Sequence, residues 1–172
     1  IKVSVGMMEK DCEKLNEVFV KVMKTGIPFV TLKTAMSLDG KIATREGDSQ
    51  WISGVKSRDF VHELRNQNDA ILVGTNTILK DNPQLTCRLK KKRGRHPARI
   101  ILDRRNRIPL TAKVFANSKA HRVVYVSGSK LSTKREQLLK TKNIEVLKVK
   151  TLKSGFDLKQ LMKLLAQKEL NS

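Results

Sequence analysis

The chain has 172 residues, of which 39% are hydrophobic, and it carries a formal net charge of +20. This length suits a single domain, and the apolar content is enough for a packed core, which excludes a wholly disordered chain. The sequence contains no run of about 18 apolar residues and no recognisable signal peptide, so we expect no membrane-spanning helix and a cytoplasmic location. The two cysteines, Cys12 and Cys87, have neither disulfide nor metal-ligand spacing, and we expect both thiols to be reduced.

The positive charge is concentrated in the second half of the chain. Residues 1–86 carry 12 basic and 11 acidic side chains, whereas residues 87–172 carry 24 and 5. The densest stretch, Arg88 to Arg107, holds ten basic residues and one acid. Such asymmetry is typical of proteins that bind nucleic acid, membranes or phosphates, but it also fits a lysine-rich solvated surface. Because charge governs association rather than fold, the solvated surface is the favoured interpretation.

The beginning of the chain contains a helical pattern followed by a strand-like segment. Apolar residues at helical spacing predict a helix over residues 8–25: Cys12, Leu15, Phe19, Val22 and Met23. Gly26 stands where a helix C-cap belongs, and Pro28 prevents continuation of the helix. Residues 28–35 are rich in β-formers and predict a strand. An Asp-Gly pair four residues later indicates a turn.

The middle of the chain alternates predicted helices and strands. We expect Ser53 to cap a helix that carries the apolar residues Val55, Phe60, Val61 and Leu64. Residues 70–74 indicate a short buried strand that ends in glycine. Thr75 is expected to cap a brief helix that Asn82-Pro83 ends. Residues 88–97 form a basic loop without hydrophobic periodicity.

The last part of the chain repeats this alternation. Residues 99–103, 123–127 and 144–149 are predicted strands, while Ser132 and Asp157 are expected to cap two helices. Strands that alternate with helices at these lengths predict an α/β domain whose sheet is covered by helices on both faces. Since no internal repeat or low-complexity linker occurs, the first helix is expected to precede this domain as an appendage.

Several common catalytic motifs are absent from the sequence. It contains no Gly-x-Gly-x-x-Gly fingerprint, no Walker loop and no Gly-x-Ser-x-Gly elbow. His62, His96 and His121 lie far apart, without partners at metal-ligand spacing, so no metal site is expected. The residues taken alone therefore indicate only a basic α/β domain.

Four motifs occur in an order that matches a known enzyme family. The first is Pro-Phe-Val-Thr-Leu-Lys-Thr-Ala-Met-Ser-Leu-Asp-Gly-Lys-Ile-Ala at residues 28–43, and the second is Gly-Asp-Ser-Gln-Trp-Ile at residues 47–52. The third combines residues 70–74 and Thr77 with residues 81–88, and the fourth combines residues 99–103 with 108–114. Together they resemble the reductase domain of riboflavin-biosynthesis enzymes, whose fold is related to that of dihydrofolate reductase.

This resemblance implies a domain organisation and a reaction. Residues 1–27 resemble a linker helix that follows a deaminase domain, and residues 28–172 resemble the reductase domain. The family uses NADPH to reduce the ribosyl group of 5-amino-6-(5-phosphoribosylamino)uracil to a ribityl chain, by hydride transfer to C1′. The resemblance thus implies NADPH, a phosphorylated pyrimidine substrate and a homodimer. Family members continue past the position of Ser172, so we expect this domain to lack its C-terminal strands and a glycine-rich motif.

The resemblance also assigns residues to the site. Substrate-binding positions of the family correspond to Ser49, Arg65, Leu85 and Arg88, and arginine suits a 5′-phosphate because its guanidinium binds in a bidentate manner. Cofactor-binding positions correspond to Ala35, Trp51, Thr77 and Asp81. From the residues alone, Arg65 could be a solvated helix residue, Trp51 a core residue and Asp81 part of an Asn-Pro turn.

Proton transfer and cofactor selectivity involve further residues. Lys33 and Asp81 are the predicted catalytic residues, because a lysine within an apolar strand is costly unless it is paired or functional. A desolvated ammonium can act as an acid near neutrality. The alternative is that Lys33 points to solvent from an edge strand. Arg104, where the family often has a small polar residue, and Arg105 follow a strand end and are expected to hold the 2′-phosphate of NADPH.

Two other functions are compatible with the sequence. One is a module that binds nucleic acid or another polyanion through residues 88–107, although stacking aromatic residues are scarce and nucleic acid is the less favoured partner. The other is a catalytically inactive, reductase-like subunit. The four ordered motifs favour the enzyme over both alternatives.

Overall fold

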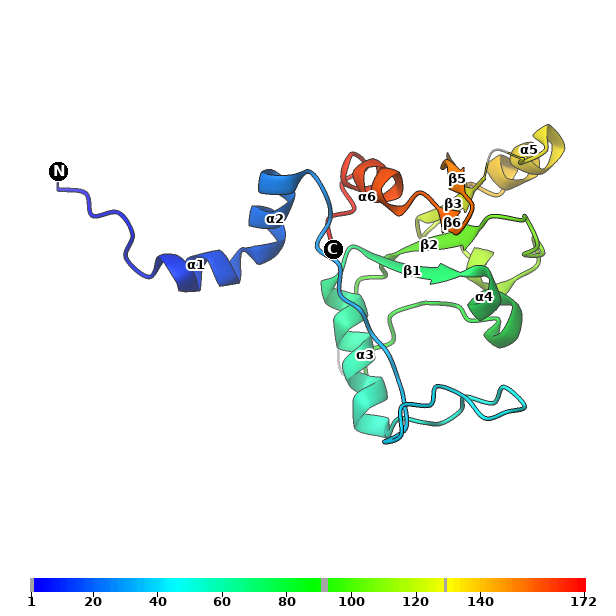
Figure 1. The fold of residues 1–172 in the computed structure, drawn as a ribbon, viewed down its shortest axis with the longest axis horizontal. Coiled ribbons are helices and arrows are strands. Elements are labelled where there is room, and N and C mark those ends of the chain that lie inside the picture. Colours follow the sequence, from blue (N-terminus) through cyan, green and yellow to red (C-terminus); the bar gives the residue numbers. More distant parts are fainter. Residues whose placement is uncertain (1, 91–92, 129) are drawn as a thin grey trace.

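The computed structural model describes residues 2–90, 93–128 and 130–172. Its centre is a parallel four-stranded sheet in the order β1-β2-β3-β4 (Figure 1). These strands are β1 (Ala70–Gly74), β2 (Ala98–Asp103), β3 (Val123–Ser127) and β4 (Glu145–Lys148). A short antiparallel pair, β5 (Thr151–Leu152) and β6 (Gly155–Phe156), follows β4. The four long strands lie where the sequence predicts strands in this half of the chain, so their positions are confirmed. The predicted burial of β1 is wrong, because none of its residues is buried and Leu72 is 40% exposed.

Some of the helices connect and cover the strands, and others lie outside the sheet. They are α1 (Glu9–Leu15), α2 (Glu17–Thr25), α3 (Val55–Gln67), α4 (Thr75–Asp81), the 3₁₀ turn η1 (Lys113–Phe115), α5 (Thr133–Thr141) and α6 (Leu158–Ala166). The connections between consecutive parallel strands contain α4, η1 and α5. Because such crossovers are right-handed and step in one direction across this sheet, they lie on one face of it. Across the described parts of the chain, none of the helices has the length and apolar character needed to cross a membrane.

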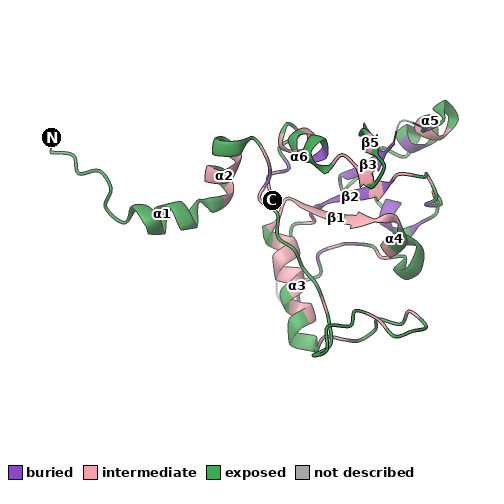
Figure 2. Cartoon of the chain, viewed as in Figure 1, coloured by how far each residue is buried: buried purple, intermediate pink, exposed green. Residues whose placement is uncertain are grey.

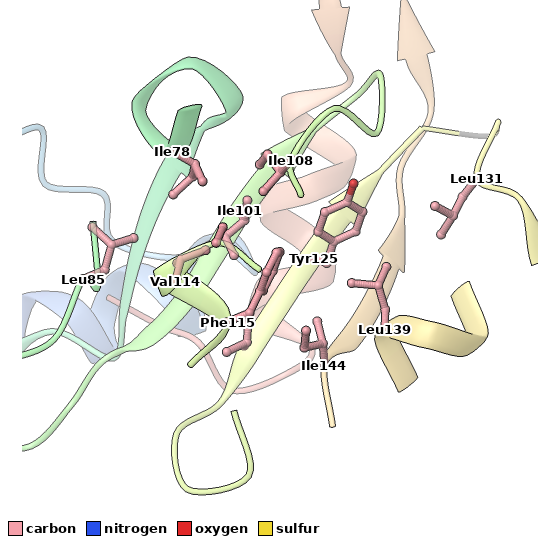
Figure 3. Close-up of a cluster of buried hydrophobic side chains, with 12 residues drawn as sticks. Ile78, Leu85, Ile101, Ile108, Val114, Phe115, Tyr125, Leu131, Leu139 and Ile144 are labelled. Carbon is pink, nitrogen blue, oxygen red and sulfur yellow. The ribbon is translucent and has the colours of Figure 1, made fainter. Parts of the chain in front are cut away.

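One face of the sheet packs against α4, the segment that leads into η1, and α5 (Figure 3). Ile101 of β2 and Tyr125 of β3 are paired in the register and fully buried. Ile78 of α4 and Leu139 of α5 belong to the same buried cluster. This packing explains why α4 and α5 each present apolar residues to the sheet.

The opposite face of the sheet packs against α6. Leu161 and Leu165, one turn apart on this helix, join Ile100, Val124 and Val126 in a second buried cluster. Strands β2 and β3 are therefore apolar on both faces, as expected for the centre of a parallel sheet. The α/β class, with helices on both faces of the sheet, is confirmed.

Leu161→Ala is expected to lower the free energy of unfolding by about 2–5 kcal/mol, because the side chain is fully buried and the substitution leaves a cavity. Urea denaturation measures this loss. Leu158→Ala is the matched control, since Leu158 is 56% exposed on the same helix, and we expect a change of about 0.5 kcal/mol or less. Equal losses in the two variants would contradict the packing of α6 on the sheet.

Three of the predicted helix ends are confirmed. Ser132 accepts a hydrogen bond from the backbone nitrogen of Arg135 at 3.3 Å, and Asp157 accepts one from Gln160 at 3.0 Å. Both side chains satisfy an N–H group that the first turn of a helix leaves without a partner. Gly26 ends α2 in the left-handed conformation, with φ of 65°.

Two other predicted caps are wrong. Gly54 rather than Ser53 is the N-cap of α3, and Gly74 rather than Thr75 is the N-cap of α4. The hydroxyl of Thr75 donates instead to the carbonyl oxygen of Leu102, at 2.8 Å, on the neighbouring strand β2. A tertiary hydrogen bond has here replaced the local one that the sequence indicates.

The single helix predicted over residues 8–25 is two helices, α1 and α2. Asn16, between them, has φ of −107° and ψ of 22°, and its side chain donates to the Cys12 carbonyl oxygen at 2.9 Å. An asparagine that bonds nearby backbone in this way competes with regular helix geometry. Neither helix contains a buried residue, and Figures 1 and 2 show both extending away from the sheet.

The strand predicted over residues 28–35 is wrong. The segment pairs with no strand in the described part of the chain, and Leu32 within it is 86% exposed. Phe29 donates to the carbonyl oxygen of Asn171 at 2.8 Å, and the adjacent Ser172 accepts from the first residue of β1 at 2.9 Å. The C-terminal residues thus lie between this segment and β1. Side chains that favour β-structure form a strand only where a neighbouring strand supplies the hydrogen bonds.

Candidate functional site

Three of the four predicted substrate-binding residues line one cavity. This cavity, called the substrate cavity below, has a volume of about 330 Å³. Its lining comes from α3, from the segment after α4 and from η1, and consists of Arg65, Asn82, Pro83, Gln84, Leu85, Arg88 and Lys113. The structure therefore brings Arg65, Leu85 and Arg88 together. Ser49, the fourth predicted residue, is exposed and is not part of this lining.

Arg65 is the half-buried cation of the substrate cavity. Its Nη1 donates to the Thr86 carbonyl oxygen at 3.0 Å, which ties α3 to the segment that carries Leu85 and Arg88. Its Nε is buried and has no hydrogen-bond partner among the described residues. Burial lowers the pKa of Arg65, and the nearby charge of Arg88 lowers it further. Two clustered guanidinium groups and a donor without a partner favour an anionic ligand. The alternative that Arg65 is only a solvated helix residue is wrong.

Backbone contacts position Arg88. Its nitrogen donates to Nδ1 of His62 on α3, at 3.2 Å. Leu85, in the same segment, is buried and adopts a φ of 55°, so the chain turns back toward the sheet after α4. Burial lowers the pKa of His62, and the charges of Arg65 and Arg88 lower it further. A neutral imidazole can accept the hydrogen bond that holds Arg88 in place.

Sequence reasoning missed Lys113 as a member of the substrate cavity. Its backbone nitrogen donates to Oδ1 of Asn82 at 2.9 Å, which brings η1 against the end of α4. The fourth motif contains Lys113, but its position in the motif does not reveal a neighbour 31 residues away. Asn82 and Gln84 were also missed, although they lie inside the third motif.

The predicted cofactor residues Thr77 and Asp81 share one face of α4, one turn apart. Thr77 is half-buried and Asp81 is exposed at the last position of the helix. The turn after this helix is held by Asn82 rather than by Asp81: the Asn82 side-chain oxygen accepts a hydrogen bond from the Lys113 nitrogen. Asp81 is therefore directly adjacent in sequence to a residue that lines the substrate cavity.

Arg104 lies at the carboxyl edge of the sheet. It directly follows β2, is half-buried and forms no ion pair among the described residues; the same holds for the exposed Arg105. Gly128, which follows β3, packs closely against the backbone of Arg104, since a Cβ on Gly128 would lie 3.4 Å from the Arg104 carbonyl oxygen. Ligands of open parallel sheets bind outside the carboxyl ends of the strands. These cations therefore fit the phosphates of a dinucleotide.

The end of one lysine side chain on α4 reaches the exposed loop that carries Ser49 and Trp51. A Cβ on Gly47 would lie 3.0 Å from Nζ of Lys80, in the last turn of that helix. Trp51 is 71% exposed, and the guanidinium carbon of Arg58 is 4.3 Å from the centre of its ring. The alternative that Trp51 is a core residue is therefore wrong.

Lys33 and Ala35 lie in the extended segment that forms no strand. Lys33 is exposed and Ala35 is half-buried. The predicted cost of burying the Lys33 ammonium in an apolar strand is absent, because the segment is not part of the sheet. Burial was expected to make the Lys33 ammonium an acid, and this expectation is wrong because the side chain is exposed. The catalytic role of Lys33 stays a prediction.

The described residues offer no metal centre. No group of three or more His, Cys, Asp or Glu side chains comes together among them. Neither cysteine forms a disulfide within the described part of the chain; Cys12 is exposed and Cys87 is buried. What the site does offer is clustered cations and hydrogen-bond donors, which suit phosphate-bearing ligands.

Comparison with known proteins decides the family. Residues 28–172 match the family model described as the RibD C-terminal domain. The chain belongs to the RibD C-terminal domain family. A relative of this domain, the riboflavin biosynthesis protein RibD of Aquifex aeolicus (strain VF5), is 40% identical over 170 residues, which cover 99% of the chain and 46% of the relative.

Solved structures agree with this membership. RibD of Acinetobacter baumannii matches 99% of the chain and 45% of its own length, with 34% identity and a TM-score of 0.80. A Thermotoga maritima protein, described as a diaminohydroxyphosphoribosylaminopyrimidine deaminase/5-amino-6-(5-phosphoribosylamino)uracil reductase, matches 96% of the chain and 43% of its own, with 38% identity and a TM-score of 0.77. The chain spans less than half of these relatives. The predicted family and its dihydrofolate-reductase-like α/β fold are confirmed.

Proposed function

We propose that this RibD C-terminal domain reduces the ribosyl group of 5-amino-6-(5-phosphoribosylamino)uracil to a ribityl chain, with NADPH as the reductant. The observation that carries the proposal is the convergence of Arg65, Leu85 and Arg88 on one cavity. These residues correspond to substrate-binding positions in the resemblance. The Thermotoga maritima relative, whose description includes this reductase activity, supports the choice of reaction.

The substrate cavity suits a phosphorylated sugar. Arg65 and Arg88 offer planar guanidinium groups that bind a phosphate in a bidentate manner, and Lys113 adds a third cation. Arg65 has a buried Nε that a phosphate oxygen would satisfy. We therefore place the 5′-phosphate of the substrate among these three side chains, with its reacting carbon directed toward α4.

The cofactor is proposed to bind along the carboxyl edge of the sheet. NADPH supplies the hydride that reduces C1′ of the sugar. Arg104 and Arg105 hold its 2′-phosphate, while Thr77 and Trp51 contact other parts of the dinucleotide. Ala35, with its small side chain, leaves space for the flat ring. Asp81, next to the substrate cavity, and Lys33 hold and deliver the proton that the reduction requires.

The deciding assay follows NADPH oxidation in the presence of 5-amino-6-(5-phosphoribosylamino)uracil. It is run with the 172-residue chain and with a protein extended beyond Ser172. We expect the extended protein to form the ribityl product. A folded, extended protein that binds NADPH but forms no ribityl product would overturn the proposal and would leave the inactive reductase-like subunit as the better reading.

Replacing Arg104 and Arg105 together by alanine is expected to reduce the preference for NADPH over NADH about tenfold, because the 2′-phosphate loses its charge-assisted contacts. The ratio of kcat/KM for the two cofactors measures this preference. Lys130→Ala, which removes an exposed cation after β3, is the control and should leave the ratio unchanged. An unchanged ratio in the double variant would show that these arginines do not hold the 2′-phosphate.

Two further expectations remain proposals for this protein. The homodimer implied by the resemblance predicts a doubled mass in sedimentation or light scattering. The cytoplasmic location is tested by fractionation of the natural host.

A further inference from the structure

A second and larger cavity has a strongly basic lining. Its volume is about 620 Å³, which is within the usual range of small-molecule pockets. The lining consists of Cys87, Arg88, Leu89, Arg93, Gly94, Arg95, His96, Ala120, His121 and Arg122. No acidic side chain belongs to this lining in the part of the chain that the structure describes. We call it the amino-edge cavity, for the reason given next.

The amino-edge cavity lies where β2 and β3 begin. His96 stands two residues before β2, and Arg122 directly precedes β3. The two strand starts are joined, since the nitrogen of Arg99 donates to the Arg122 carbonyl oxygen at 3.0 Å. Arg104, at the proposed cofactor edge, follows the other end of β2. A strand of 6 residues separates the two edges by about 20 Å.

Close contacts define the wall of this cavity. The backbone nitrogen of Cys87 donates to Nδ1 of His96 at 3.1 Å, and the ring centres of His96 and His121 are 4.2 Å apart. The buried Arg99 donates to the His121 carbonyl oxygen at 3.3 Å. A Cβ on Gly94 would lie 2.6 Å from Sγ of Cys87, so only glycine fits there without a shift. Gly94 and both imidazole rings are thus held in place by packing and hydrogen bonds.

The arginines of the amino-edge cavity are unequally neutralised. Arg95 is paired with Asp69 at 2.9 Å, and Arg122 with Glu145 at 3.1 Å. Arg88 and Arg93 form no ion pair with a described carboxylate. The cavity therefore faces two guanidinium groups whose charge is not balanced within the described chain.

His96 reflects the same excess of positive charge. Burial lowers the pKa of His96, and the neighbouring His121, Arg99 and Arg93 lower it further. A positive field resists protonation of this imidazole. A bound anion would relieve the repulsion among these groups, whereas a bound cation would increase it.

We propose that the amino-edge cavity binds a small ligand through a diphosphate group, at a site separate from the substrate cavity. Two guanidinium groups match the two phosphate units, because each can form a bidentate contact. Because Nδ1 of His96 accepts from the Cys87 nitrogen, the neutral imidazole carries its proton on Nε2, which can donate to a bound anion. Arg88 lines both cavities and forms their common wall, whereas Arg93, His96 and His121 line only the amino-edge cavity.

Pyrophosphate is the probe for this site, and the histidine signals in NMR spectra are the readout. The chain has 3 histidines, so their imidazole resonances can be assigned by substitution. We expect pyrophosphate to raise the pKa of His96, because the nearby anion favours the imidazolium form. His62 adjoins Arg65 of the substrate cavity and Arg88 of both cavities, so its signal is compared with and without Arg65. Sodium chloride at the same ionic strength controls for screening of charges.

Arg93→Met is the decisive variant. We expect it to weaken the pyrophosphate affinity measured at His96 at least tenfold, since it removes a charge-assisted contact. Lys90→Met is the matched control, because Lys90 lies in the same loop, pairs with Asp59 at 2.6 Å and does not line the cavity. Arg65→Met should remove the part of the His62 response that comes from the substrate cavity, while the response of His96 persists.

Three results would overturn the proposal. The first is a pyrophosphate response of His96 that survives Arg93→Met. The second is a response that sodium chloride reproduces at equal ionic strength. The third is a response confined to His62, which would place the diphosphate in the substrate cavity alone. None of these measurements depends on reductase activity, so failure here leaves the proposed reaction untouched.

Discussion

Arg65→Met is expected to raise the KM for 5-amino-6-(5-phosphoribosylamino)uracil about 10- to 100-fold, with a smaller change in kcat. A charge-assisted hydrogen bond to a phosphate contributes about 1.5–3 kcal/mol, which corresponds to this range. The phosphate is remote from C1′, so the contact is present in both the bound substrate and the transition state. Removing a contact that binds the substrate and the transition state equally raises KM and changes kcat little.

The position of Arg65 explains why it should matter more than other arginines. It is half-buried, it is fixed to the Thr86 carbonyl oxygen, and its Nε has no partner among the described residues. A phosphate in the substrate cavity would meet an arginine that is already oriented, so little side-chain entropy is lost on binding. Arg88 is exposed, and we expect a smaller effect from its removal.

Two further variants separate charge from geometry. Lys56→Met removes an exposed cation from the first turn of the same helix and should leave KM unchanged. Arg65→Lys keeps the charge but loses the bidentate geometry, so we expect an intermediate KM. Steady-state kinetics with the natural substrate measure all three variants. If Lys56→Met raises KM as much as Arg65→Met does, the effect is long-range electrostatics and not phosphate binding.

The core of the fold could be predicted because its signals are local. Strands β2 and β3 are runs of apolar residues, and Ser132 and Asp157 are side chains whose capping partners lie three residues away. The predicted strand over residues 28–35 shows the limit of such reasoning. Its residues favour β-structure, but pairing requires a neighbouring strand, and propensity alone does not supply one.

The site was predictable only in part, for a related reason. Nothing in the local sequence distinguishes Arg65 from another helix arginine; its role came from the ordered motifs, and its contact with Thr86 spans 21 positions. Lys113 was missed because it approaches the substrate cavity through a hydrogen bond to Asn82, far away in the sequence. The basic stretch predicted a positively charged surface, but it did not indicate which of its residues line each of the two cavities.

Asp103→Ala is expected to lower the free energy of unfolding by about 3–5 kcal/mol. The side chain is fully buried, and its Oδ2 accepts hydrogen bonds from Ile108 N at 2.8 Å and from the Tyr125 hydroxyl at 2.8 Å. Its Oδ1, at 3.1 Å, shares the single hydroxyl proton of Thr75 with the Leu102 carbonyl oxygen. Alanine removes the acceptor of the Ile108 nitrogen and the nearest acceptor of the Tyr125 hydroxyl, and each buried donor without a partner costs about 1–3 kcal/mol. Urea denaturation measures the total.

Tyr125→Phe dissects this network. Burial raises the pKa of Tyr125, and the hydrogen bond to Asp103 raises it further, so the hydroxyl stays protonated and acts as a donor. Phenylalanine keeps the ring in the core and removes the hydroxyl that donates to Asp103 and accepts from Arg135 at 3.5 Å, for an expected loss of about 1 kcal/mol. If Asp103→Ala costs no more than Tyr125→Phe, the carboxyl group is not the centre of the network. If it costs several times more, Asp103 is what joins the start of α4, the loop after β2 and strand β3 at the edge where the cofactor is proposed to bind. Arg104, the next residue, then owes its position to Asp103.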